Sequence, residues 1–342
     1  MREALLYDRV EDSRVRCKLC AHRCLVADGK RGICQVRENQ SGTLNTLVYG
    51  QLVAQALDPI EKKPLYHFHP GTPALSVATV GCNFRCLFCQ NADISQMPRD
   101  ERLTQGREVA PEEIVRAAQR HHSPSIAYTY TEPTIFFEYA CDIGTLARQA
   151  LIANVWVTNG YMTPEMLDTV TAPEGPTLMD AANVDLKSFR DAFYREECGA
   201  RLQPVLDSLK RMKQRRVWVE VTTLLIPGLN DSDEEVEDIA RFIVEELGPE
   251  TPWHVSRFHP TYRMNDRPPT PVSTVHRARE IGLRAGLRYV YEGNVPGGEG
   301  EHTYCPTCRQ AVIRRARFTI LDHRAHGGLC AHCGARIDGV GL

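Results

Sequence analysis

The sequence predicts an α/β protein built from repeated strand–helix units, with a small cysteine-rich module at each end. Between residues 74 and 293, short β-rich runs alternate with amphipathic stretches, a pattern typical of a parallel sheet covered by helices. The 13 cysteines fall into three separated groups, and only Cys141 and Cys198 lie outside them. These groups divide the chain into expected modules at residues 1–73, 74–298 and 299–342.

The repeated units follow one another along the middle of the chain. The expected strands cover residues 75–80, 125–130, 153–158, 182–187, 217–225, 253–258 and 287–291. The expected helices cover residues 110–121, 134–151, 163–170, 201–214, 232–247 and 272–285. Two helices begin with favourable chemistry, because Pro111 precedes two glutamates and Ser232 stands among acids.

The composition is that of an ordinary soluble globular protein. The 342 residues contain 42% hydrophobic and 25% charged side chains and carry a net charge of −2, which gives no overall attraction to nucleic acid or anionic membranes. No apolar run reaches the roughly 18 residues of a membrane span, and residues 1–16 lack the apolar core of a signal peptide. We therefore expect a cytoplasmic protein, in which reducing conditions favour metal binding by cysteines over disulfides.

Cys82, Cys86 and Cys89 form the central group, with the spacing Cys-x3-Cys-x2-Cys. They follow the expected strand 75–80 and Gly81, so we place them on a loop at the strand's end, where α/β barrels build active sites. Three thiolates can bind three irons of a [4Fe–4S] cluster and leave the fourth iron free to bind another molecule. A zinc ion would need a fourth protein ligand, and the nearby residues offer no obvious His or Cys.

Cys305, Cys308, Cys330 and Cys333 form the C-terminal group. Two Cys-x2-Cys pairs separated by 21 residues are a strong zinc-ribbon signal, because four thiolates complete a closed tetrahedral site. The tail has few large apolar side chains, so a metal is expected to support its folding. We expect structural zinc in this module.

Cys17, Cys20, Cys24 and Cys34 form the N-terminal group. Four ligands at these spacings fit one zinc ion, and they also fit a second iron–sulfur cluster or free thiols. His22 could replace one cysteine, although a solvated loop histidine is the simpler interpretation. We expect zinc in this module and keep the second cluster as the alternative.

The central group resembles the cluster motif of the radical S-adenosylmethionine superfamily, Cys-x3-Cys-x-aromatic-Cys, with Phe88 as the aromatic residue. This resemblance implies a partial (β/α)6 TIM-type barrel and a [4Fe–4S] cluster whose open iron binds S-adenosylmethionine. It further implies that one electron cleaves the sulfonium and releases a 5′-deoxyadenosyl radical, which abstracts hydrogen from a substrate. The electron is expected to come from a donor such as a flavodoxin or ferredoxin.

The resemblance assigns a cofactor-binding role to the end of the second strand. Thr131 and Glu132 stand where the family has Gly-Gly-Glu-Pro, although Tyr130 and Thr131 replace the two glycines. Glu132 would accept a charge-assisted hydrogen bond from the methionine ammonium. The alternative is that Glu132 only caps the helix that follows it.

The next strand ends carry the remaining candidates. Thr158, Asn159 and Gly160 match the family's Thr-Asn-Gly, which contacts the ribose or the carboxylate, although Asn-Gly is also a common turn. Asp185 and Lys187 match the Asp-x-Lys of glycyl-radical activating enzymes and would face the cofactor or the substrate. His259, after the sixth expected strand, would face the substrate. The alternatives are a surface ion pair and an ordinary loop histidine.

Over nearly its full length the chain resembles the radical enzyme of the AmmeMemoRadiSam system. The residues that carry this resemblance lie in the 17–34, 130–133, 257–260 and 293–297 segments and in the terminal ribbon. The resemblance implies association with Memo-type and AMMECR-type proteins. Its nearest mechanistic relatives, pyruvate formate-lyase activating enzymes, take a hydrogen atom from a glycine of a partner protein. The expected substrate is a protein, a peptide or a small molecule.

A second function class is a metal-dependent module that binds nucleic acid or protein through the two cysteine-rich ends. Both ends contain more Arg and Lys than acidic residues. Aromatic side chains for base stacking are sparse there, and the overall charge is slightly negative, so nucleic acid is the less favoured partner. Formation of 5′-deoxyadenosine would distinguish the radical enzyme from a binding module.

Overall fold

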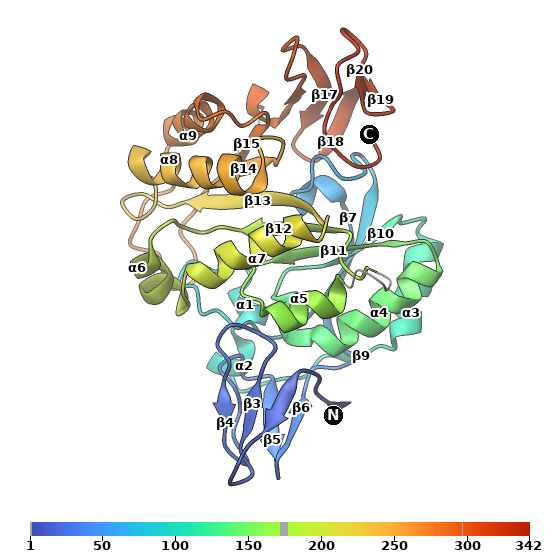
Figure 1. Ribbon diagram of the computed structural model, residues 1–342, viewed down its shortest axis with the longest axis vertical. Helices are drawn as coiled ribbons and strands as arrows, with labels where there is room; N and C mark the ends of the chain where they lie inside the picture. Colours follow the sequence, from blue (N-terminus) through green and yellow to red (C-terminus); the bar gives the residue numbers. More distant parts are fainter. Residues whose placement is uncertain (1, 172–176, 296) are drawn as a thin grey trace.

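The computed structural model describes residues 2–171, 177–295 and 297–342. Its largest element is a nine-stranded sheet in the order β15-β14-β13-β12-β11-β10-β8-β7-β9, which runs through the middle of the molecule (Figure 1). The neighbouring strands from β8 to β15 are all parallel. They are β8 (Pro73–Thr79), β10 (Ser125–Tyr128), β11 (Ala153–Thr158), β12 (Ala181–Asp185), β13 (Trp218–Leu225), β14 (Trp253–Arg257) and β15 (Val290–Gly293).

These strands lie where the sequence predicts them, with differences at the ends. The second expected strand stops at Tyr128, because Tyr130 has a φ of +62° that no strand residue adopts. The last expected strand forms at 290–293 and pairs with β14, so the described parallel sheet has one strand more than a (β/α)6 unit.

Two antiparallel strands extend the other edge of the sheet. β7 (Gln51–Pro59) pairs with β8, and β9 (Arg107–Glu108) pairs with β7. Within the described ranges, no pairing joins β9 to β15, so the sheet is open.

Helices follow most of the parallel strands and cover the sheet (Figure 1). They are α3 (Pro111–Arg120), α4 (Phe137–Gln149), α5 (Pro164–Val170), α7 (Gln203–Gln214), α8 (Asp233–Phe242, continued by the π-helical turn η4, Ile243–Leu247) and α9 (Val272–Arg284). Every residue of β10 is buried, as expected for parallel strands covered on both faces. At the start of α8, the Ser232 hydroxyl accepts a hydrogen bond from the Glu235 backbone nitrogen, which is the capping that its sequence predicts.

Short helical segments shape the loops of the sheet, and all except η1, which precedes β8, follow its strands at the carboxyl edge. They are α1 (Ala92–Ser95), α2 (Met97–Asp100), η1 (Ile60–Lys62), η2 (Pro133–Phe136), α6 (Asp191–Phe193), the π-helical turn η3 (Tyr194–Cys198) and η5 (Glu299–Glu301). None of the described helices has the length and apolar character needed to cross a lipid bilayer.

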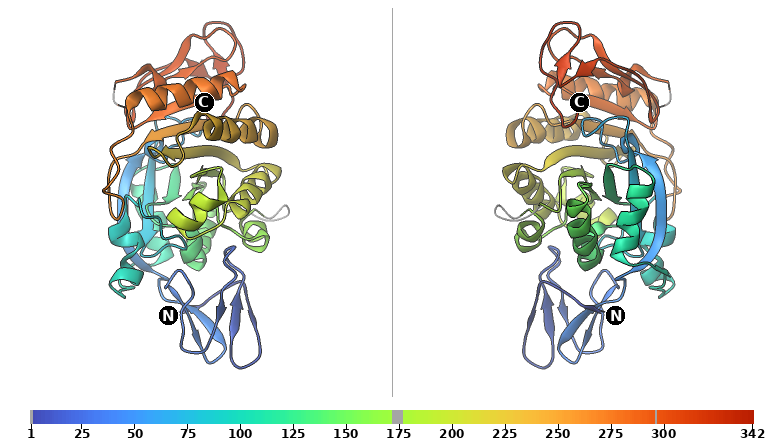
Figure 2. Two further views of the ribbon diagram at one scale, coloured as in Figure 1. Left: turned by 90° about the vertical axis from the view of Figure 1, so that its left-hand side faces the viewer. Right: turned by 90° about the vertical axis from the view of Figure 1, so that its right-hand side faces the viewer.

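The N-terminal residues form two small antiparallel sheets at one end of the molecule (Figure 2). One contains β1 (Arg2–Glu3), β6 (Thr43–Thr46) and β5 (Arg37–Gln40), and the other contains β2 (Tyr7–Arg9), β3 (Val15–Cys17) and β4 (Leu25–Val26). The second sheet docks beside α5, where the Thr163 hydroxyl donates to the Lys18 carbonyl at 2.6 Å.

The C-terminal residues form a compact group of strands at the opposite end (Figure 2). They are β16 (Thr303–Tyr304), β17 (Ala311–Ala316), β18 (Thr319–His323), β19 (Ala325–His326) and β20 (Leu329–Cys330). Arg315 joins this group to the main sheet, because its buried guanidinium donates to the Tyr66 carbonyl at 2.9 Å and lies over the Tyr66 ring.

Candidate active site

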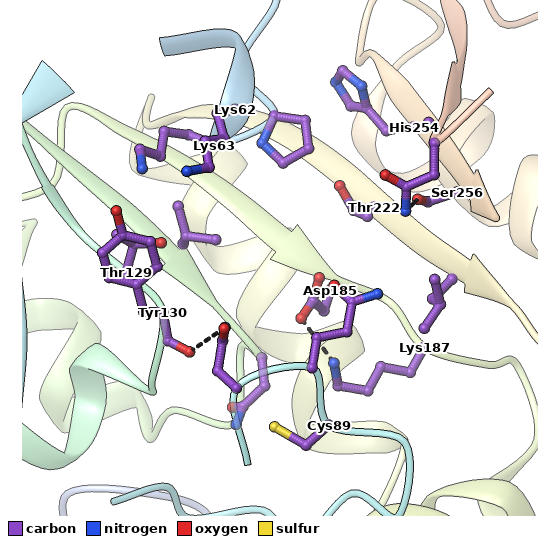
Figure 3. Close-up of a pocket in the computed structure, with 18 of the residues that line it drawn as sticks. Lys62, Lys63, Cys89, Thr129, Tyr130, Asp185, Lys187, Thr222, His254 and Ser256 are labelled. Atoms are coloured by element: carbon purple, nitrogen blue, oxygen red, sulfur yellow. Dashed lines mark hydrogen bonds and ion pairs between the residues drawn. The ribbon is translucent and has the colours of Figure 1, made fainter. Parts of the chain in front are cut away.

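A cavity of about 920 Å³ lies at the carboxyl ends of the parallel strands. Its lining side chains come from the strands β10 to β15 and the residues that follow them, from the loop after β8, from the segment between β7 and β8 and from the tail, and Figure 3 shows part of this lining. Parallel α/β sheets place their ligand sites at this edge. The volume lies near the upper end of the usual range for ligand sites, about 300–1,000 Å³, so it suits a cofactor-sized molecule.

The three cysteines of the central group all line this cavity, as the sequence predicts. Their loop is held by the π-helical turn at 194–198. The Arg85 backbone nitrogen donates to the Cys198 carbonyl at 2.9 Å, and the Leu87 nitrogen donates to the Glu197 carbonyl at 3.0 Å. Cys198 is fully buried behind the loop and does not line the cavity.

The spacing and surroundings of these sulfur atoms fit an iron–sulfur cluster. Within the described ranges, only the tail cysteines bring three or more possible ligand atoms within 4.8 Å of one another. The sulfurs of the central group are therefore more widely spread than those around one zinc ion, whose Zn–S bonds measure about 2.3 Å. Burial raises the pKa of the Cys82 and Cys89 thiols, so bound iron would be what keeps them deprotonated.

Glu132 lines the cavity and is almost completely buried. Its carboxylate accepts hydrogen bonds from the Thr134 nitrogen (3.1 Å) and hydroxyl (2.6 Å), the Thr158 hydroxyl (2.7 Å) and the Asn159 nitrogen (2.8 Å). Burial raises its pKa, while these donors oppose that shift. The hydrogen bond from the Thr134 nitrogen caps η2. Glu132 therefore both caps this helix and lines the cavity.

Asn159 connects this carboxylate to the cysteine loop. Its side-chain nitrogen donates to the Asn83 side-chain oxygen at 2.7 Å, while its own oxygen accepts from the Tyr161 nitrogen at 3.0 Å. Thr158 and Asn159 both line the cavity, whereas Gly160 forms the turn behind them with a φ of +67°. The structure thus brings the Thr-Asn pair and the cysteines to one place.

Tyr130 and Thr131 also line the cavity. Tyr130 adopts a left-handed backbone conformation, with a φ of +62°, in which glycine is far more comfortable than a bulky residue. This conformation gives a physical reason for the glycine that the resemblance places at this position. Thr131 is held by a hydrogen bond from its hydroxyl to the Thr79 carbonyl, at 2.8 Å.

Asp185 and Lys187 form an ion pair on the cavity wall (Figure 3). The Lys187 ammonium lies 2.7 Å from the Asp185 carboxylate and 5.8 Å from the centre of the Phe88 ring, and its side chain is 15% exposed. Burial tends to lower the pKa of Lys187, but the Asp185 carboxylate and the nearby Cys86 thiol raise it overall. The pair is therefore a charged element of the cavity and is unlike a surface ion pair.

His259 lies at the exposed rim of the cavity. Arg257, two residues earlier in the chain, does not line the cavity and donates instead to the Thr270 carbonyl. His254 is the buried histidine of this strand, and it pairs with the Glu220 carboxylate at 2.7 Å. Both histidines line the cavity, in contrast to the single one expected.

Sequence reasoning missed a charged cluster that the segment before β8 contributes to the cavity. Lys63, whose side chain is 1% exposed, lies 2.6 Å from the Asp58 carboxylate, and Asp58 also accepts from the Tyr130 hydroxyl. Burial lowers the pKa of Lys63 to about 8. The charged run Glu61-Lys62-Lys63-Pro64 is a detectable signal, but it falls within the expected N-terminal module of residues 1–73.

The tail was also missed as a wall of the cavity. Arg317 and Phe318, which connect β17 to β18, line the cavity together with Glu301. The Glu301 carboxylate accepts a hydrogen bond from the Arg317 backbone nitrogen at 2.9 Å. The C-terminal group of strands therefore contributes side chains to the candidate site.

The four tail cysteines meet as the sequence predicts. The sulfurs of Cys305 and Cys333 are 3.7 Å apart, those of Cys308 and Cys330 are 3.8 Å apart, and all four lie within 4.8 Å of one another. This spacing is that of a closed tetrahedral metal site. The N-terminal cysteines lie together around a second, small cavity.

Comparison with known sequences supports this interpretation of the site. The sequence model of the Radical SAM superfamily matches residues 76–243. An uncharacterized protein of Methanocaldococcus jannaschii is 46% identical over 340 residues, which cover 99% of both chains. Another protein of that organism, provisionally named a glycyl-radical enzyme activating enzyme, is 27% identical over 177 residues, covering 49% of this chain and 62% of that one.

Solved structures show the same fold. A radical SAM methyltransferase from Sphaerobacter thermophilus has a TM-score of 0.53 and 17% identity, covering 76% of each chain. SuiB from Streptococcus suis, bound to S-adenosylmethionine, has a TM-score of 0.50 and 13% identity, covering 69% of this chain and 53% of that one. With its three cysteines on the loop after β8 and its family match over the strands that follow, this chain belongs to the Radical SAM superfamily.

Proposed function

We propose that this protein cleaves S-adenosylmethionine reductively and uses the 5′-deoxyadenosyl radical to abstract hydrogen from a peptide or protein. The observation that carries the proposal is that Cys82, Cys86 and Cys89 line the same cavity as the polar strand ends. The cluster, when bound, would supply one electron to the sulfonium. An external donor such as a flavodoxin or ferredoxin would replace that electron.

In this proposal the protein's residues bind and orient the cofactor. Glu132 would bind the methionine ammonium at the end of β10. Asn159 would hold the end of β11 against the cysteine loop through its hydrogen bond to Asn83. Phe88 and the walls of the cavity would exclude water from the sulfonium.

The ion pair on the cavity wall would serve the second reactant. Lys187 lies near Phe88 and pairs with Asp185, and the two would orient the substrate or the ribose by charge-assisted hydrogen bonds. His259, at the exposed rim, would contact a substrate as it enters.

Two findings favour a peptide or protein substrate. The related M. jannaschii protein named above carries an activating-enzyme name, and a solved form of SuiB is bound to its precursor peptide, with a TM-score of 0.50 and 15% identity. Association with Memo-type and AMMECR-type proteins is part of this proposal and rests on the sequence resemblance. Zinc in the tail would keep the Arg317–Phe318 turn in place on the cavity wall.

Anaerobic reconstitution with iron and sulfide tests the proposal. Adding S-adenosylmethionine to the reduced protein should change the electron paramagnetic resonance spectrum of the cluster, because the cofactor binds the open iron. Cys141→Ala, outside the three cysteine groups, should behave like the natural protein. A cluster whose spectrum does not change when S-adenosylmethionine is added would contradict the proposal and favour a binding module.

A further inference from the structure

The N-terminal cysteines surround a small apolar cavity that is separate from the candidate active site. Cys17, Cys20, Cys24 and Cys34 all line it. Cys17 and Cys20 are buried, and the other two are partly buried. Four cysteine side chains from a strand, two loops and a turn thus meet at one cavity, and no disulfide joins the cysteines of the described residues.

The spread of these sulfur atoms favours a cluster over a single zinc ion. The tail cysteines provide an internal standard for one metal ion, since their four sulfurs lie within 4.8 Å of one another. In the part of the chain that the structure describes, no three N-terminal cysteines meet that limit. They share this wider spread with Cys82, Cys86 and Cys89. Thiolates that bind different irons of one cluster are spread in this way.

A buried cation completes the site. Arg37 is 2% exposed and lines the small cavity. Its guanidinium donates to the Glu138 carboxylate at 2.6 Å, but its Nε atom has no hydrogen-bond partner among the described residues. Burying such a donor is costly unless something accepts from it. The sulfur atoms of an anionic cluster would accept this hydrogen bond.

The N-terminal site lies directly against the loop of the catalytic cysteines. His22, between Cys20 and Cys24, places its ring nitrogen 2.8 Å from the Asn83 carbonyl. Gly81 has a φ of +105°, and a Cβ there would lie 2.7 Å from Val36 and 3.6 Å from the Cys34 carbonyl. Both contacts reach a neighbour of Cys82 along the chain, so the two cysteine sites are separated by a single layer of residues.

We propose that Cys17, Cys20, Cys24 and Cys34 hold a second iron–sulfur cluster, which passes single electrons to the cluster held by Cys82, Cys86 and Cys89. A cluster with four protein ligands has no open iron for a substrate, so electron transfer is the chemistry it can perform. A reduced flavodoxin or ferredoxin gives up one electron and is oxidised. The second cluster takes up that electron and passes it on, and no bond forms or breaks.

Metal analysis of the anaerobically reconstituted full-length protein tests the proposal. The triple variant C82A/C86A/C89A leaves the N-terminal module untouched. It should retain about two or four irons per chain with matching sulfide, the content of one cluster, together with about one zinc. Adding C17A, C20A, C24A and C34A should remove this iron and leave the zinc, whereas adding Cys141→Ala should change neither.

The proposal would be overturned by a triple variant that contains no iron. This holds whether that variant contains about two zinc ions per chain or has no metal at the N-terminal site. This readout is metal content, so it is independent of whether the protein cleaves S-adenosylmethionine. Magnetic resonance of the fully reduced natural protein tests the electron-transfer step. Two neighbouring reduced clusters should broaden each other's signals, and two clusters with independent signals would contradict the relay.

Discussion

The backbone nitrogen of Asn159 donates a hydrogen bond of 2.8 Å to the Glu132 carboxylate, so that the ends of β10 and β11 are joined at the floor of the cavity. The Asn159 side chain then reaches Asn83 in the cysteine loop. Glu132 therefore has two tasks in this account, because it holds two strand ends together and presents negative charge to the cavity. A single carboxylate connects the architecture of the sheet to the proposed binding of the cofactor.

Glu132→Gln should weaken the binding of S-adenosylmethionine without removing the catalytic cluster. The amide keeps the shape but loses the charge that would pair with the methionine ammonium. A charged hydrogen bond contributes roughly 1.5–3 kcal/mol, so we expect affinity to fall by roughly one to two decades. Calorimetric titration of the reconstituted variant measures this loss. Thr131→Ser, which keeps the hydroxyl bonded to Thr79, is the control. Unchanged affinity would leave Glu132 as a helix cap alone.

Tyr130→Gly should be more stable than Tyr130→Ala. Both variants lose the phenol that contacts Asp58, but alanine must keep the left-handed φ of +62° that glycine adopts freely. The difference should be about 1 kcal/mol in the free energy of unfolding. Denaturant unfolding of the two variants provides the comparison. Equal stabilities would show that the backbone relaxes at this position.

Lys187→Met should slow the formation of 5′-deoxyadenosine by roughly tenfold, because it leaves the Asp185 carboxylate unpaired in the cavity. Iron content should stay the same, since Lys187 is not a ligand. Lys210→Met is the matched control, because Lys210 forms a surface ion pair with Glu246 at 2.9 Å. If both variants react at the natural rate, the Asp185–Lys187 pair has no part in the reaction.

The protein should lose stability as the pH falls from about 6.5 towards 4. His67 is fully buried, and burial lowers its pKa to about 4. Between these values the unfolded state binds one more proton than the folded state, so stability rises with pH. Across this pH range, the titration of His67 changes the free energy of unfolding by about 3 kcal/mol in total. Chemical unfolding across this range measures the slope. His67→Phe should be less stable overall but should lack this slope above pH 4.5, and a variant that keeps the full slope would contradict the assignment.

The sequence predicted the strands, the helices and the places of the cysteines because hydrophobic periodicity and cysteine spacing are local signals. The roles expected for Glu132, Asn159, Asp185 and Lys187 came from the family resemblance, and their meeting at one cavity follows from the rule that parallel strands share one edge. The left-handed backbone at Tyr130 could not be predicted from the tyrosine itself, since a bulky residue gives no sign of it, and its signal was the glycine that the resemblance places at this position. The contributions of Lys63 and Phe318 depend on the packing of segments that are far apart in the chain. The charged run around Lys63 is visible in the sequence, but no local pattern places it, or Phe318, at the cavity.

The central claim is that the loop after β8 generates a 5′-deoxyadenosyl radical. The most direct test is to reduce the reconstituted protein with dithionite in the presence of S-adenosylmethionine, and to measure 5′-deoxyadenosine by mass spectrometry. We expect its formation by the natural protein and by Cys141→Ala, and none by the variant C82A/C86A/C89A. Equal amounts of 5′-deoxyadenosine from the triple variant, or none from the natural protein with its cluster intact, would contradict the account.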